Sequence, residues 1–173
     1  MKNKNEAGFS VLEMMVAVAI MSILVSFTVQ AFLSGSRIVH ANLVSSNIAS
    51  EIRRGMESMT QELRNSSLAR ITVIQPGVLQ FQTPTNMTQD GVITWSGILQ
   101  YSLGGINQQL LRTDLATGQT RVYANYVTAL TFTVTQNPAT IAIVMTAQQQ
   151  TPERITYSET LRSAVEGYYA DIG

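Results

Sequence analysis

The segment FSVLEMMVAVAIMSILVSFTVQAFLSGS, residues 9–36, decides the architecture of the chain. Its one charged residue is Glu13, and the next charged residue along the chain is Arg37. An apolar run of more than about 20 residues is long enough to cross a bilayer as a helix. The run contains no proline, which would break or kink such a helix. The segment therefore predicts a transmembrane helix near the N-terminus.

The residues that precede this run indicate its orientation. Residues 1–8, MKNKNEAG, are short and polar and contain Lys2 and Lys4. Because basic residues favour the cytoplasmic side of a membrane, we expect the N-terminus in the cytoplasm and the rest of the chain outside it.

The residues that follow the run continue the helix, but their pattern is amphipathic instead of apolar on all sides. Apolar residues recur there at spacings of three and four, which is the pattern of an amphipathic helix. No helix-stopping residue separates the two parts, so we expect one helix over residues 9–66, with Gly35 and Gly55 as points where it can bend. We expect Glu51, Glu57 and Glu62 on its solvated face. The apolar stripe consists of Val44, Ile48, Ile52, Met56, Met59 and Leu63.

The apolar period changes to two after Arg70, which predicts β-strands. Turn signals such as Pro76-Gly77, Asp90-Gly91 and Gly104-Gly105 separate the strands, and the short connections favour antiparallel pairing. Residues 83–91, TPTNMTQDG, are expected to form a polar loop. The predicted strands cover residues 71–75, 78–83, 92–95, 98–103, 109–113, 119–124, 129–135, 140–147 and 154–165.

These patterns together predict an α+β fold, in which the long N-terminal helix packs on an antiparallel β-sheet domain. The amphipathic half of the helix is the expected cover for one sheet face. In the last strand, Glu159 falls in phase with Tyr157 and Leu161, which indicates a bulge or an edge position. Trp95 lies on a predicted strand, and we expect it to pack on the core.

The composition argues against an enzyme. The chain has no cysteine and one histidine, which excludes thiol chemistry, disulfides and histidine-rich metal sites. Basic and acidic residues both number 11, so no bulk basic field attracts nucleic acid. No serine–histidine–aspartate arrangement or glycine-rich phosphate loop is present. We therefore expect no catalytic residues, no cofactor, no metal ligands and no nucleic-acid partner.

Three residues at the start of the apolar run suggest a function. A carboxylate such as that of Glu13 costs about 2.5–3.5 kcal/mol inside a membrane span, so it usually has a partner. Cleavage between Gly8 and Phe9 would create an α-amino group four residues before Glu13. That distance is one helical turn, so the amine and the carboxylate would share a face.

The segment GFSVLEMMVAVAIMSIL, residues 8–24, resembles the prepilin N-terminal signature of type IV pilins and type II secretion pseudopilins. The resemblance implies the pilin fold, cleavage after Gly8 by prepilin peptidase, N-methylation of Phe9, and an assembly role in which Glu13 pairs with a Phe9 amino terminus. It also implies a single-pass inner-membrane protein with a periplasmic or extracellular C-terminal domain. The implied partners are other pilin or pseudopilin subunits, prepilin peptidase, the inner-membrane assembly platform and membrane lipid before assembly.

The β-rich part resembles the minor pilin and J- or W-type minor pseudopilin branch. The matching positions are Leu111-Arg112, Leu130-Thr131-Phe132 and Leu161-Arg162. The expected domains are a leader at residues 1–8, a helix at 9–68 and a β-rich domain at 69–173. Within the helix, residues 9–33 are expected to span the membrane and residues 37–66 to form the amphipathic part.

The function that follows is a minor pilin of a type IV pilus, involved in initiation or the filament tip. A minor pseudopilin of a type II secretion system is an alternative, and gene neighbours would separate the two. A different alternative is a membrane-anchored extracytoplasmic binding domain with an uncleaved signal anchor. An ordinary signal peptide cleaved after Val29-Gln30-Ala31 is a third.

Overall fold

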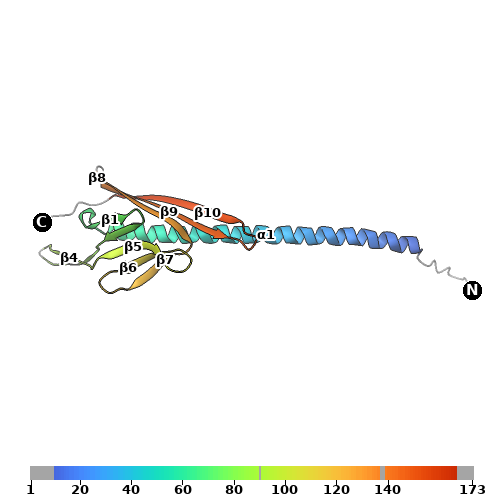
Figure 1. Ribbon diagram of the computed structural model, residues 1–173, viewed down its shortest axis with the longest axis horizontal. Coiled ribbons are helices and arrows are strands. Elements are labelled where there is room, and N and C mark those ends of the chain that lie inside the picture. Colours follow the sequence, from blue (N-terminus) through green and yellow to red (C-terminus); the bar gives the residue numbers. More distant parts are fainter. Residues whose placement is uncertain (1–9, 90, 137–138, 167–173) are drawn as a thin grey trace, which may run out of the picture. The chain divides into compact units, whose positions relative to one another are not determined.

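A computed structural model describes residues 10–89, 91–136 and 139–166 of the chain (Figure 1). The chain divides into two compact units, Met1–Asn42 and Leu43–Gly173. One helix, α1 (Val11–Arg64), contributes to both units, and the β-strands belong to the second. The predicted long helix is therefore confirmed, although it starts and ends two residues inside the predicted range.

The β-strands follow a short 3-10 helix, η1 (Leu68–Arg70). Every strand pairing is antiparallel, as the short connections predicted. The strands of the described residues are β1 (Thr72–Gln75), β2 (Val78–Phe81), β3 (Pro84–Met87), β4 (Ile93–Trp95), β5 (Leu99–Gly104), β6 (Gln109–Asp114), β7 (Thr120–Ala124), β8 (Val127–Gln136), β9 (Ala139–Gln150) and β10 (Thr156–Glu166).

The strands form three sheets. A five-stranded sheet has the order β1-β2-β5-β6-β7, a three-stranded sheet has the order β10-β9-β8, and β3 pairs with β4 in a separate hairpin. In Figure 1 the two larger sheets lie on different sides of the C-terminal part of α1. The Phe132 amide donates a hydrogen bond of 2.7 Å to the Pro76 carbonyl, which joins β8 to the turn after β1.

The core of the second unit lies between α1 and these two sheets. The predicted stripe is buried from Ile48 to Leu63, whereas Val44 is half-buried at its beginning. Gly55 allows close packing, because an added Cβ would lie 2.8 Å from the Cβ of Ala124 in β7. Each large buried side chain contributes about 1.5–3 kcal/mol. The largest partners from the sheets are Leu79, Phe81, Tyr101, Leu110, Ile141, Ile143 and Met145.

Two expectations about the strands have different outcomes. The loop predicted at residues 83–91 is wrong in its first half, because β3 pairs there with β4 through Pro84–Trp95 and Met87–Ile93. All four β3 side chains are exposed, so the strand has no buried apolar face to mark its sequence. Glu159 lies in an edge strand with an unbroken register, which confirms the edge position and not the bulge.

Candidate assembly site

The site begins where α1 begins, at Ser10 and Glu13. The Leu12 amide donates to the Ser10 hydroxyl at 3.3 Å, and the Ser10 amide donates to the Glu13 carboxylate at 3.3 Å. These bonds resemble a capping box in which the Ser10 hydroxyl accepts from the second helical residue, Leu12, instead of the third, and they satisfy two of the amides that a helix N-terminus leaves free. The negative charge of Glu13 also lies in the first turn, where the helix dipole favours it.

The helix surface that follows Glu13 is apolar and exposed. Large apolar side chains from Val11 to Leu33 are about half to three-quarters exposed in the isolated chain. Its length and composition make α1 a candidate membrane span. Such a surface needs a cover, because a soluble monomer rarely exposes a continuous apolar patch of this extent.

Hydroxyl groups within this surface are satisfied by the helix itself. Ser22, Ser26 and Thr28 each donate a hydrogen bond of 2.8 Å to the backbone carbonyl four residues earlier. These bonds lower the desolvation cost of the hydroxyls in lipid or in a bundle of helices.

Of the three predicted site residues, Gly8, Phe9 and Glu13, the structure describes Glu13. Gly8 and Phe9 lie outside the described residues, and the Glu13–Phe9 pair stays a prediction. Glu13 lies at the start of α1 as expected. Ser10 was missed, although the Ser-x-x-Glu spacing of residues 10–13 is the sequence signature of a capping box.

In the second part of α1, the carboxylate of Glu62 is hydrogen-bonded by side chains of the five-stranded sheet. One carboxylate oxygen accepts hydrogen bonds from the Tyr101 hydroxyl at 2.7 Å and from Arg112 Nε at 3.1 Å. The other oxygen accepts the Tyr123 hydroxyl at 2.5 Å. The donors come from β5, β6 and β7, so this cluster fixes the five-stranded sheet against α1. Because the donors are far from Glu62 in sequence, no local pattern predicts the cluster.

This environment changes the acidity of both tyrosines. Burial, followed by the charge of Glu62 and the hydrogen bond to it, raises the pKa of Tyr101 far above its usual value of 10. Burial and the hydrogen bond to Glu62 raise the pKa of Tyr123 to about 12. Both hydroxyls therefore remain protonated donors at neutral pH.

Glu51 is a further fixed carboxylate. It accepts hydrogen bonds from the Asn125 amide at 2.7 Å and from Asn125 Nδ2 at 3.0 Å, and it pairs with Arg54. The expectation that Glu51, Glu57 and Glu62 share a solvated face is therefore wrong for two of them, and Glu57 alone is exposed. Periodicity places a residue on a helix face but does not show which polar loops and strands meet that face.

The described residues contain no cluster of three or more His, Asp or Glu side chains that would hold a metal ion. The polar groups of the second unit instead connect α1 to the sheets. Within residues 10–36, the helix surface carries one carboxylate, Glu13, and no other charge. This exposed apolar surface is suited to association with lipid or with other helices.

The comparison with known proteins concerns the N-terminal part of the chain. Residues 3–29 match the family model described as the prokaryotic N-terminal methylation motif. No curated protein and no solved structure matches the chain. The match includes Gly8, Phe9, Ser10 and Glu13, together with most of the exposed apolar surface of α1.

Proposed function

We propose, from the premise that the chain carries the N-terminal signal of type IV pilins and pseudopilins, that it is a minor pilin of a type IV pilus. In this role it is a structural subunit that assembles through the first part of α1 and acts in filament initiation or at the tip. The signal itself points to a structural subunit and not to an enzyme. One observation carries the proposal: an exposed apolar helix whose only charge over residues 10–36 is Glu13.

The apolar part of α1 has two successive environments in this proposal. Before assembly it lies in the inner membrane, with the N-terminus in the cytoplasm and the second unit outside. In the filament it leaves the lipid and packs against the helices of other subunits. Lipid and protein are similarly apolar, so moving the helix between them gives little driving force. Packing and polar pairing therefore decide whether the subunit assembles.

Glu13 supplies that polar pairing. Prepilin peptidase cleaves after Gly8 and methylates the new amino terminus of Phe9. The amine then neutralises Glu13 of a neighbouring subunit in the filament core. Only one oxygen of the Glu13 carboxylate accepts a hydrogen bond within the described residues, and that bond is long. The carboxylate can therefore accept an incoming amine without losing its helix cap.

The decisive experiment replaces Glu13 in the full chain in its native cells. Glu13→Ala should leave membrane insertion intact and lower incorporation into purified filaments at least about tenfold, the effect expected for loss of a charge-assisted bond in an apolar environment. Glu57→Ala is the matched control, since Glu57 is an exposed glutamate on the same helix. Equal incorporation of both variants would contradict the proposal.

Intact mass of the protein from those filaments tests the processing step and the alternatives. A chain that begins at Phe9 and is heavier by one methyl group supports a pilin or a pseudopilin. Isolation of the protein from surface pili favours the pilin, and isolation from a secretion pseudopilus favours the alternative. A chain that still begins at Met1, or one cut after Ala31, would contradict both.

A further inference from the structure

The part of the second unit formed by residues 71–111 is almost free of charge. Its one charged residue is Asp90, although the segment builds β1 to β5 and the first half of β6. Well-behaved soluble surfaces carry about 25–35% charged residues. The centres of protein–protein interfaces, by contrast, are depleted of Lys, Glu and Asp and enriched in aromatic residues, Met and Arg. Residues 71–111 share the depletion of charged residues, although they contain no Arg, one Met and three aromatic residues.

Several apolar side chains on this part are exposed. Met87 and Val92, on the β3–β4 hairpin and its turn, are 65% and 63% exposed, and Ile98 before β5 is 45% exposed. The hairpin is paired with neither of the two larger sheets. An isolated two-stranded hairpin is marginally stable in water, so a partner that covers it would stabilise it.

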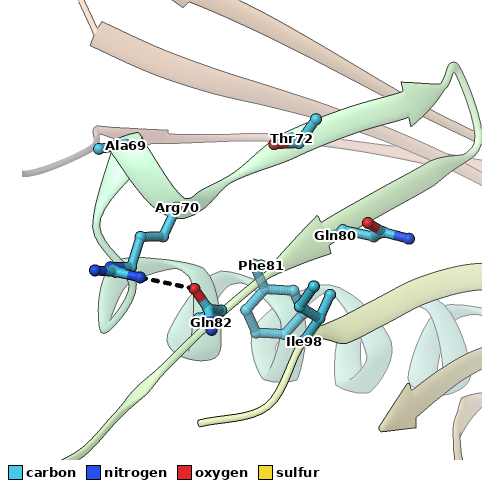
Figure 2. A pocket seen from close by; sticks show the side chains of 7 residues that line it. All are labelled: Ala69, Arg70, Thr72, Gln80, Phe81, Gln82 and Ile98. Atoms are coloured by element: carbon cyan, nitrogen blue, oxygen red, sulfur yellow. Dashed lines mark hydrogen bonds between the residues drawn. The ribbon is translucent and has the colours of Figure 1, made fainter. Parts of the chain in front are cut away.

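A hollow of about 380 Å³ lies beside the base of this hairpin (Figure 2). Figure 2 shows the Arg70 side chain along one side of the hollow, with Gln82 next to its guanidinium and Ile98 across from it. The remaining residues that line the hollow are Ala69, Thr72, Gln80 and Phe81.

The guanidinium of Arg70 is held in place by neutral groups. It lies 4.6 Å from the centroid of the Trp95 ring, and its Nη1 donates to Gln82 Oε1 at 2.9 Å. Gln82 is itself held by two hydrogen bonds. Its side-chain Nε2 donates to the Ser96 backbone carbonyl at 2.8 Å, and its backbone carbonyl accepts a hydrogen bond of 2.6 Å from the Ser66 hydroxyl. The plane of the guanidinium is thus set by contacts on two sides.

No described carboxylate pairs with Arg70, whereas Arg54 pairs with Glu51 and Arg112 with Glu62. A guanidinium has five N–H donors in a planar fork, which matches a carboxylate in a bidentate pair. Its hydrogen bond to Gln82 uses one of these donors. A carboxylate side chain of another protein is therefore the group that this positioned cation fits best.

We propose that the hollow at Arg70, together with the exposed side chains of Met87, Val92 and Ile98, is a docking surface for a neighbouring filament subunit that places a carboxylate on Arg70. We name this surface the Arg70 face. The exposed apolar side chains favour a protein partner over an acidic polysaccharide. The inference rests on the proposed function, since it takes the partner to be a subunit of the same filament.

The test uses the full chain in its native cells, with a photoreactive amino acid at position 87. After irradiation, mass spectrometry should locate the adduct on a peptide of another filament subunit that contains Asp or Glu. Arg70→Gln should lower the yield of this adduct at least about tenfold, and Arg70→Lys should lower it less because the charge is retained. Replacing the partner's acidic residue with Arg should restore the adduct of an Arg70→Glu variant.

A second pair of variants leaves Arg70 and Trp95 intact. Ile98→Glu places a carboxylate on the rim of the hollow and should lower the adduct yield by a similar factor. Ile155→Glu is the matched control, because Ile155 is 52% exposed and lies between β9 and β10, outside the Arg70 face. Protease resistance of each variant verifies that the second unit is folded.

The outcomes separate this inference from the proposed function. If the wild-type chain is present in filaments but position 87 gives no adduct with another subunit, the Arg70 face is not a docking surface. Equal adduct yields for Ile98→Glu and Ile155→Glu, or an adduct with polysaccharide alone, would also overturn it. If the wild-type chain is absent from filaments and begins at Met1, the proposed function fails and this inference fails with it.

Discussion

The two parts of α1 use the same backbone in opposite ways. In residues 11–43 the large apolar side chains are exposed, whereas from Ile48 to Leu63 the apolar side chains form one stripe that is buried against the sheets. The exposed apolar side chains of the first part are removed from water only in lipid or against other helices. The second part is covered within its own chain, so it needs no partner to remain folded.

The glutamates of the two parts show the same difference. Glu62 accepts three hydrogen bonds from residues of three strands, whereas Glu13 accepts one from the backbone at the start of its own helix. A carboxylate held by three donors from neighbouring strands stabilises a fold, whereas one with a single weak hydrogen bond remains available for a partner. The comparison assigns stability to the second part of α1 and association to the first.

The largest expected effect on stability comes from shortening an isoleucine in each part. Ile52→Ala should lower the free energy of unfolding of the second unit by about 2–5 kcal/mol, because it leaves a cavity in a packed core. Ile20→Ala should change that free energy by less than about 0.5 kcal/mol. Urea titration of the full chain in detergent, followed through the fluorescence of its one tryptophan, Trp95, measures both. Equal losses would contradict the division between the two parts.

A smaller effect is expected from removing a glutamate in each part. Glu62→Ala should lower the free energy of unfolding of the second unit by about 1–3 kcal/mol, because Tyr101, Arg112 and Tyr123 lose their acceptor. The exposed Glu57 provides the control, and Glu57→Ala should have almost no effect on unfolding. Glu13→Ala should likewise leave unfolding unchanged while lowering filament incorporation. A loss of stability in Glu13→Ala as large as that in Glu62→Ala would remove the distinction.

Much of the fold could be predicted from periodicity. Apolar residues every three or four positions mark the buried stripe of α1, and alternation marks the longer strands, because burial on one face leaves a repeating pattern. The strand β3 left no such pattern, since all of its side chains are exposed. The bounds of β8 and β9 extend beyond their predicted ranges, because backbone pairing continues through polar residues such as Gln148 and Gln150. In contrast, β10 begins two residues later than predicted, after Arg154, whose φ is positive.

The candidate site was predictable only where it is local. Glu13 was found because a carboxylate at the head of an apolar run is unusual, and the nearby Ser10 was readable from its spacing. The bonds of Glu51 to Asn125 and of Glu62 to Tyr123 connect residues far apart in the sequence. A helical pattern contains no information about such partners, so both glutamates looked solvated.

The smallest expected effect concerns the alkaline limit of the second unit. The folded state raises the pKa of Tyr123 to about 12, mainly through burial and the hydrogen bond to Glu62, whereas an unfolded tyrosine titrates near pH 10. The stabilisation from the protonated hydroxyl is therefore complete below pH 10 and is lost as the pH rises from 10 towards 12. Tyr123→Phe should be less stable than the wild type by about 1 kcal/mol at pH 8, because it lacks this hydrogen bond.

Above pH 10 the difference between Tyr123→Phe and the wild type should shrink, because only the wild type has a hydroxyl at position 123 to ionise. Tyr101, whose pKa is raised further, is present in both the wild type and Tyr123→Phe, so both lose stability from its ionisation at high pH. Urea titrations at intervals from pH 8 to pH 12 measure the difference. The first part of α1 contains no tyrosine, so its helicity in detergent should stay constant over this range. A constant difference in free energy across the range would show that folding does not raise the pKa of Tyr123.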